Sequence, residues 1–293
     1  MASKQDLIDL QPKNDFFVGI DSDGCAFPTM ELKHKECFIP NIVQYFGLQS
    51  VSKYAREAAE FVNLYSKWRG INRFPALLMA VDLLRERTEV AASGVELPAL
   101  SELKKWVDSG IALGNPTLTA EVESNGSDEL KQVLAWSTAV NESVDWMVHG
   151  CKPFSWVRES LQKMQDTADM LVVSATPVPA LTKEWNEHDI AKHVRVIAGQ
   201  EMGNKKEHLE MATGGKYDQE KVLMIGDAPG DMRAAKANNA LFFPINPGHE
   251  EGSWKVLHDE AFERFVAGTY AGDYEAELIE KFEALLPDTP PWK

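Results

Sequence analysis

The sequence predicts an α/β protein: a Rossmann-like, doubly wound parallel sheet with an all-helical domain inserted after its first strand. Short apolar runs have the length and continuous hydrophobicity of buried parallel strands. Four runs are clear: Phe16–Ile20, Met170–Val173, Val222–Ile225 and Ala240–Pro244. Helical patterns separate the later runs, and strand–helix alternation implies right-handed crossovers within one sheet. The long stretch between the first run and the second contains no convincing strand.

The remaining elements of the α/β part are weaker. A fifth strand is expected at Val194–Ala198. Helices are expected from Pro153 to Met164, which leads into the second apolar run, and from Lys205 to Met211. The last part of the chain also has a helical pattern, with Leu278, Phe282 and Leu285 on one side. These helices would cover the sheet.

The segment 25–151 has the periodicity of amphipathic helices. Ser127, followed by two acidic residues, fits the N-cap of one of them. Three groups of apolar residues each fall on one helical face: Phe61, Leu64, Tyr65 and Trp68; Leu77, Val81 and Leu84; Val133, Trp136, Val140, Val144 and Met147. We therefore expect a helical domain at residues 25–151 and a discontinuous α/β domain at residues 1–24 and 152–293.

Composition limits the classes of function. The 293 residues are 44% hydrophobic and 26% charged, as in an ordinary soluble globular protein. The net charge of −15 disfavours nucleic acid and anionic membranes as partners. Cys25, Cys37 and Cys151 are an odd number at wide spacing, which predicts neither a disulfide framework nor a zinc site. With no signal-peptide pattern and no membrane-length apolar run, we expect a cytoplasmic protein of unassigned oligomeric state.

Acidic residues follow two of the predicted strands directly. Asp21 and Asp23 come after the first strand, and Gly24 supplies a sharp turn. Asp227 comes after the Val222–Ile225 strand and Gly226, and Asp231 lies one helical turn later. Ligands bind at the carboxyl edge of such sheets, and carboxylates this close repel each other unless a cation intervenes. Mg²⁺ takes oxygen ligands, so these acids predict a magnesium site.

Two further segments suit an anionic ligand. Ser174 follows the second predicted strand, where a hydroxyl and exposed backbone amides can hold phosphate oxygens. Lys205 and Lys206 lie at the start of a helix, where a cation gains nothing from the helix dipole. That placement suggests a function such as neutralising phosphate.

Each motif alone has an ordinary structural explanation. The acids could be solvated turn residues or helix caps, and Ser174 could be a helix cap. The two lysines could lie on the solvated surface. In their order and spacing, however, Asp-Ser-Asp-Gly, Val-Val-Ser-Ala-Thr, Asn-Lys-Lys-Glu-His-Leu and Ile-Gly-Asp-Ala-Pro-Gly-Asp together resemble the haloacid dehalogenase-like superfamily. The resemblance covers roughly residues 14–24 and 152–245. The helical insertion resembles the first cap type of that family.

The resemblance implies a function for each matching residue. Asp21 matches the nucleophile that forms an aspartyl-phosphate, and Asp23 matches the general acid and base. Ser174 matches the phosphate-binding residue of the second motif. Lys205 matches the third-motif lysine, with Lys206 as the alternative. The implied Mg²⁺ site is formed by the residues of the first and fourth motifs: Asp21, Asp23, Asp227 and Asp231.

A turn inside the insertion is the candidate for substrate selection. Arg69, Asn72 and Arg73 lie around a glycine and a proline, and arginines on a tight turn in an acidic protein suit an anionic or polyhydroxyl group. A helical corner with solvated arginines is the alternative. The segment Lys33–Lys35 is a second candidate for substrate binding. The alternative is that it forms an ordinary charged surface.

The resemblance implies a Mg²⁺-dependent phosphatase that acts on a small phosphorylated metabolite through an aspartyl-phosphate. Asp23 favours this over dehalogenation, because an alkoxide leaving group needs a proton. A phosphomutase acting on a sugar phosphate would use the same residues. A non-catalytic binding protein on the same fold would be expected to have lost motifs that are intact here. A nucleotide-binding dehydrogenase would need a Gly-rich turn after the first strand, which is absent.

Overall fold

The computed structural model describes residues 3–293, which fall into two compact units. The first consists of the chain up to Met30 together with residues 150–286, and we call it the core. The second consists of residues 31–149 together with residues 287–293, and we call it the cap. Compared with the predicted boundaries, residues 25–30 belong to the core and residues 287–293 to the cap.

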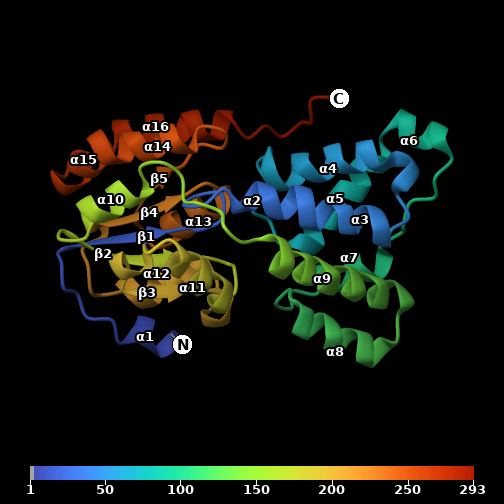
Figure 1. Cartoon of the computed structure of the whole chain (residues 1–293), viewed down its shortest axis with the longest axis horizontal. Coiled ribbons are helices and arrows are strands. Elements are labelled where there is room, and N and C mark those ends of the chain that lie inside the picture. The colour runs from blue at the N-terminus through green and yellow to red at the C-terminus, as the bar shows by residue number, and fades with distance from the viewer. Residues whose placement is uncertain (1–2) are drawn as a thin grey trace. The chain divides into compact units, whose positions relative to one another are not determined.

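The core is built on a five-stranded parallel sheet with the order β3–β2–β1–β4–β5 (Figure 1). The strands are β1 (Phe16–Ile20), β2 (Ala168–Val173), β3 (Val196–Ala198), β4 (Val222–Gly226) and β5 (Leu241–Pro244). The predicted parallel sheet is thereby confirmed, and its weakest strand is β3. In the centre of the sheet, Ile20 pairs with Val172 on one side and Ile225 on the other. The residues that follow these three strands therefore emerge at one edge.

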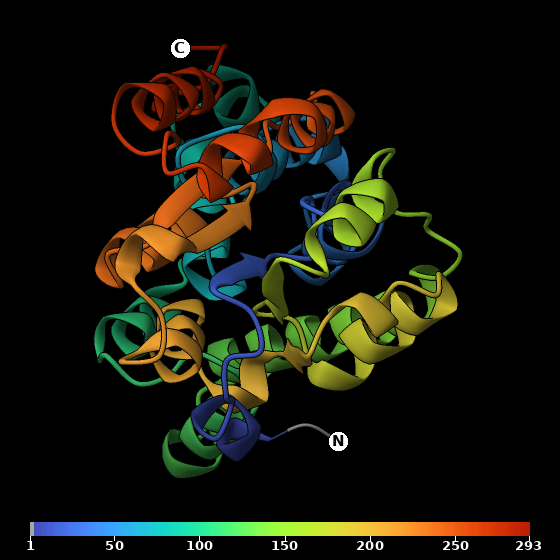
Figure 2. The same cartoon turned by 90° about the vertical axis from the view of Figure 1, so that its left-hand side faces the viewer.

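Helices cover both faces of the sheet (Figure 2). One face packs against α10 (Val157–Met164), α11 (Val178–Glu187), α14 (Glu250–Val256) and α15 (Phe262–Val266). The other packs against α1 (Lys4–Ile8), α12 (Lys205–Thr213), α13 (Pro229–Ala237) and α16 (Asp273–Ala284). Alternate residues of β1 pack on opposite faces of the sheet: Val18 and Ile20 pack on the first face, and Phe17 packs on the second. Burial on both faces explains why the strands read as continuous apolar runs.

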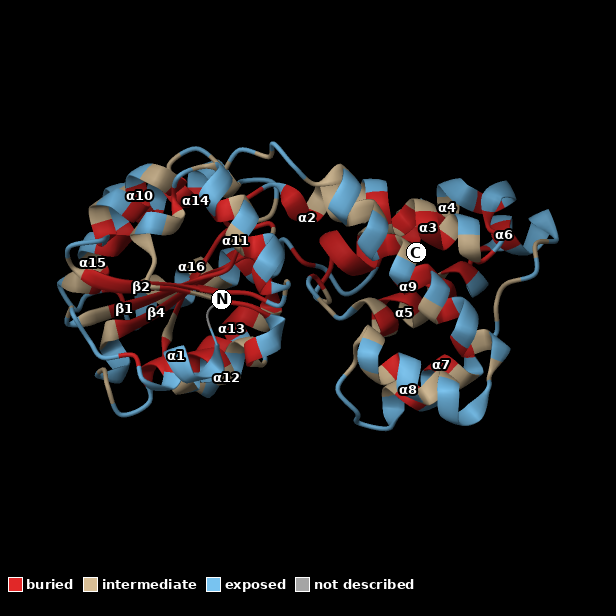
Figure 3. Ribbon diagram, turned by 60° about the horizontal axis from the view of Figure 1, so that its bottom comes forward, coloured by how far each residue is buried: buried red, intermediate tan, exposed pale blue. Residues whose placement is uncertain are grey.

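The cap is helical. In residues 31–149, all of which are described, every regular element is a helix. They are the end of α2 (Thr29–Leu32), a π-helix (Lys33–Phe38), α3 (Ile39–Tyr45), α4 (Ser52–Leu64), α5 (Arg73–Arg85), α6 (Thr88–Ser93), α7 (Ser101–Asp108), α8 (Asn115–Asn125) and α9 (Asp128–Met147). The Ser127 hydroxyl accepts a hydrogen bond from the Leu130 amide at 3.3 Å, which confirms the predicted N-cap. Buried residues follow the inward faces of these helices (Figure 3).

Short helical turns complete the described chain. Those of 3-10 type are Gln49–Val51, Ala191–His193, Gln200–Met202 and Gln219–Lys221, and one further π-helix is Leu257–Ala261. Across residues 3–293, no helix combines the length and the apolar composition needed to cross a membrane.

Residues 287–293 pack on the cap although they follow the last helix of the core. The Trp292 ring lies 3.9 Å from the guanidinium of Arg87 and meets the Phe61 ring edge-on at 5.7 Å between centroids. Phe61 and its apolar neighbours form a small buried cluster in the cap, and Trp292 packs against it. The predicted boundary missed this packing because nothing local in a Pro-Pro-Trp sequence indicates its long-range contacts.

Replacing Trp292 by alanine should therefore destabilise the cap. Loss of a partly buried aromatic ring with a close cation–π contact costs about 1–3 kcal/mol. Hydrogen exchange should report this as reduced protection of amides in α4 and α5. Trp146→Ala is the matched control, because that ring is 74% exposed and its loss should change protection little. Equal protection in both variants would show that the Trp292 contact does not stabilise the cap.

Candidate active site

Three acidic side chains gather at the carboxyl edge of the sheet. Asp21 follows β1 and is only 4% exposed. Its amide donates to the carbonyl of Ile225 at 3.0 Å, which extends the β1–β4 ladder by one residue and holds the Asp21 backbone. One carboxylate oxygen from each of Asp21, Asp227 and Asp231 lies within 4.8 Å of the others, and all three residues are buried. The structure therefore brings together three of the four acids that the sequence named as metal ligands, and the fourth, Asp23, is not in this group.

Lys205 neutralises part of this cluster. Its Nζ lies 2.9 Å from Oδ2 of Asp21 and 2.5 Å from Oδ1 of Asp231. Burial favours the neutral amine, but these two carboxylates outweigh it and raise the pKa of Lys205 above its ordinary value. Lys206 is exposed to solvent. Of the two lysines that the sequence offered, Lys205 is the one that contacts the acids.

The donor set fits a divalent cation. Burial raises the pKa of the Asp21 carboxyl well above its ordinary value; Lys205 opposes this shift, whereas Asp231 and Asp227 add to it. Three buried carboxylates beside one ammonium group leave an excess of negative charge when all are ionised. A hard cation with oxygen ligands, such as Mg²⁺, would offset that charge and keep Asp21 ionised.

Asp23 lies two residues beyond Asp21 but does not contribute a side-chain oxygen to the cluster. Its Oδ1 accepts a hydrogen bond from the hydroxyl of Thr29 at 2.5 Å, and its Oδ2 accepts one from the hydroxyl of Thr176 at 2.7 Å. The sequence gave no function to either threonine, although Thr176 lies within the Ser174 motif. Its separation of 153 residues from Asp23 hides this contact from local pattern analysis.

Ser174 lies just beyond β2, at the same edge of the sheet, and is 2% exposed. Its amide donates to the carbonyl of Ala198 at 3.0 Å, which fixes the backbone. Its Oγ accepts from the amide of Thr176 at 3.2 Å, so the hydroxyl hydrogen can still be donated to a ligand.

Gly226 is the last residue of β4 and has no room for a side chain. A Cβ there would lie 2.4 Å from the carboxylate carbon of Asp231. The same carboxylate accepts a hydrogen bond from the amide of Ala228 at 3.1 Å and thereby caps α13. The absence of a side chain at Gly226 therefore allows Asp231 to approach the cluster.

The cap residues predicted to bind substrate have partners within the cap. Asn72 is the N-cap of α5 and also donates to the carbonyl of Leu113. Arg73 donates to the hydroxyl of Ser137 at 3.0 Å, and to Asn141.

Arg69 is 3% exposed and donates to the carbonyl of Leu64 at 2.9 Å. These contacts give all three residues a structural function in the corner. Their proposed contact with substrate stays a prediction. In the second candidate segment, Lys35 pairs with Glu31 at 2.7 Å.

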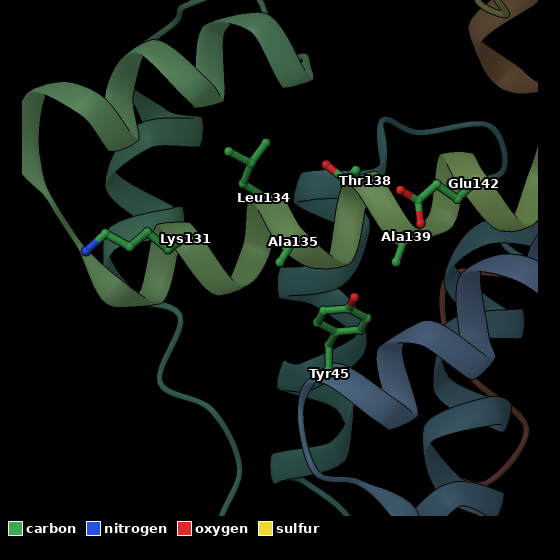
Figure 4. Close-up of a pocket in the computed structure, with 7 residues that line it drawn as sticks. All are labelled: Tyr45, Lys131, Leu134, Ala135, Thr138, Ala139 and Glu142. Atoms are coloured by element: carbon green, nitrogen blue, oxygen red, sulfur yellow. The ribbon is translucent and has the colours of Figure 1, made fainter.

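A pocket of about 360 Å³ opens elsewhere in the cap, between Tyr45 and one face of α9 (Figure 4). Lys131 and Glu142 supply its charged groups, and small or apolar residues form most of the rest. Lys131 forms an ion pair with Asp128 at 2.8 Å. We assign no function to this pocket.

Residues 110–244 match the family model described as haloacid dehalogenase-like hydrolase. The match includes the Ser174, Lys205 and Asp227 motifs, and Asp21 lies outside it. Over these residues the chain is similar to the haloacid dehalogenase-like hydrolases. No curated protein matches it.

Solved structures add support for the fold. A haloacid dehalogenase-like hydrolase from Streptococcus pneumoniae superposes with a TM-score of 0.50 at 11% identity, covering 91% of this chain and 98% of its own. A candidate phosphoglycolate phosphatase from Lactobacillus delbrueckii subsp. bulgaricus scores 0.48 at 14% identity, covering 84% and 92%. A candidate beta-phosphoglucomutase from Bacteroides vulgatus scores 0.47 at 15% identity, covering 88% and 92%. Identities this low show the fold alone.

Proposed function

We propose that this protein is a member of the haloacid dehalogenase-like superfamily and a Mg²⁺-dependent phosphatase, which hydrolyses a small phosphorylated metabolite through an aspartyl-phosphate. One observation carries the proposal: the buried carboxylate of Asp21 lies 2.9 Å from the ammonium of Lys205, at the sheet edge where Asp227 and Asp231 converge. A buried carboxylate flanked by a fixed cation and a candidate metal site is suited to attack a phosphoryl group that carries negative charge.

The first half of the reaction uses three side chains. Asp21 attacks the phosphorus, and the bond from phosphorus to the leaving oxygen breaks. Asp23 gives its proton to that oxygen, which leaves as an alcohol. Lys205 offsets negative charge on the transferring group, and the Ser174 hydroxyl donates to one of its oxygens.

The second half releases phosphate. Asp23, now ionised, takes a proton from a water molecule as that water attacks the aspartyl-phosphate. The bond between phosphorus and Asp21 breaks, which regenerates both carboxyl groups for another cycle. Thr29 and Thr176 support this exchange of protons, because their hydroxyls hold the two oxygens of Asp23 in fixed positions.

Asp21, Asp227 and Asp231 would hold the metal. Bound Mg²⁺ would act as a Lewis acid that offsets charge on the phosphoryl oxygens. A phosphomutase would use the same residues and differ in passing the phosphoryl group back to the substrate. Substrate contacts from Arg69, Asn72 and Arg73 remain part of the proposal, and they would select the group that is not transferred.

The proposal predicts phosphate release from a panel of small phosphate esters that requires Mg²⁺. EDTA should abolish it and added Mg²⁺ should restore it, because the buried acids would otherwise lack their counter-charge. The assay should follow both inorganic phosphate and isomerised substrate by NMR. Isomer formation without phosphate release would identify a mutase instead, and turnover that survives chelation would remove the metal from the mechanism.

Gly226→Ala should raise the Mg²⁺ concentration needed for half-maximal activity by at least about tenfold. The added methyl group would have to displace the carboxylate of Asp231, from which it would lie only 2.4 Å. Gly230→Ala is the matched control, since its Cβ would meet nothing closer than 3.9 Å. An unchanged magnesium requirement in a folded Gly226→Ala protein would contradict this function of the glycine.

A further inference from the structure

Ser22, between the two catalytic aspartates, makes an unusual set of buried contacts. It is fully buried, and its Oγ accepts a hydrogen bond from the indole Nε1 of Trp185 at 3.0 Å. The same oxygen donates to Oε2 of Glu184 at 3.1 Å. The hydroxyl therefore both accepts and donates, and it connects the first motif to α11. A buried hydroxyl without such partners would be costly, so these bonds account for a polar residue at this position.

The backbone of Ser22 is held as firmly as its side chain. Its carbonyl accepts from the amides of Ala26 at 2.9 Å and Phe27 at 3.0 Å. These bonds close the turn that follows Asp23 and begin the short segment that packs into the core. Ser22 is thus fixed from both sides, by its own loop and by α11.

Trp185 is a rigid anchor for this connection. Its ring is fully buried and belongs to the hydrophobic cluster on one face of the sheet. It packs edge-on against Phe27, with ring centroids 5.9 Å apart. An indole held in this way can move little, so the atom bonded to it is held in place as well.

We propose that Ser22 is a positioning residue: its bond to Trp185 fixes the loop that carries Asp21 and Asp23. The two aspartates flank Ser22 in the chain, so a rotation of this one residue displaces both carboxylates. This inference rests on the proposed phosphatase activity. The positions of Asp21 and Asp23 would then depend on α11, a helix that contributes neither residue.

The test is a double-mutant cycle with Ser22→Ala and Trp185→Phe, which remove the two ends of one hydrogen bond. Each single change should lower kcat by about tenfold while KM changes by less than about twofold, because displacement of reacting groups affects the chemical step more than binding. The double variant should lose no more than Ser22→Ala alone, since that change already removes the bond to Trp185 together with the bond to Glu184. Melting temperatures are measured alongside.

Ser160→Ala is the control. Ser160 is a second buried serine, on α10, and its hydroxyl has no hydrogen-bond partner within the described residues 3–293. Its replacement should leave kcat unchanged. If Trp185→Phe does not fold, Ser22→Ala alone decides, since it removes a single oxygen atom.

Two results overturn the inference. Wild-type kcat in Ser22→Ala, with only a lower melting temperature, would make the bond purely structural. If the fold-losses of kcat in the two single variants multiply in the double variant, Ser22 and Trp185 act separately. Failure of the proposed function would give a different result, because the wild-type protein itself would then release no phosphate. The positioning function of Ser22 would be excluded as well.

Discussion

Asp21→Asn should reduce turnover by at least about a thousandfold, to the background of the assay. An amide is nearly isosteric with the carboxylate but cannot attack phosphorus. The protein should remain folded, because the change also removes one charge from a buried group of acids. Steady-state phosphate release under saturating Mg²⁺ is the measurement.

Asp15→Asn is the matched control for this experiment. Asp15 immediately precedes β1, whereas Asp21 immediately follows it, and Asp15 is exposed. The control should keep wild-type activity. Turnover of the Asp21 variant within about tenfold of wild type would leave too small an effect for a lost nucleophile and would exclude Asp21 from that function.

Lys205→Ala should lower kcat by about a hundredfold to a thousandfold, the usual cost of losing a fixed group that offsets transition-state charge. Lys205 contacts both Asp21 and Asp231, so its loss also leaves those acids without their ammonium partner. The rate of phosphate release at saturating substrate and Mg²⁺ should report the loss.

The neighbouring lysine is the control for Lys205. Lys206 is exposed, and Lys206→Ala should behave like the wild type in the same assay. Equal losses of kcat in the two variants would indicate that turnover depends on positive charge in general and not on the contact between Lys205 and Asp21. The reverse order of effects would assign the third-motif function to Lys206.

The acidic cluster could be predicted because its signals are local. Asp21 and Asp227 come just after apolar runs, Asp231 lies one helical turn beyond Asp227, and parallel strands bring their carboxyl ends to one edge. The strand order that places β1 between β2 and β4 then brings Asp21 beside Asp227. The choice between Lys205 and Lys206 needed the structure, because adjacent helical positions both fit the motif.

The supporting contacts of Thr176 and Trp185 could not be predicted, since each joins residues far apart in the chain. Thr176 reaches Asp23 across 153 positions, and Trp185 reaches Ser22 across 163. A buried tryptophan is ordinary core by composition, and only its indole hydrogen bond distinguishes it. The cap corner was read as a ligand site from its arginines, whereas Asn72 and Arg73 have partners inside the cap that the sequence did not indicate.

Phosphorylation of Asp21 during turnover is the most direct test of the mechanism. The wild-type protein would be mixed with a substrate and Mg²⁺, quenched in acid within one turnover, digested and analysed by mass spectrometry. We expect one phosphoryl group, labile to base, on the peptide that contains Asp21, and none in the Asp21→Asn protein. A protein that releases phosphate while this peptide stays unmodified at every quench time would contradict the aspartyl-phosphate mechanism.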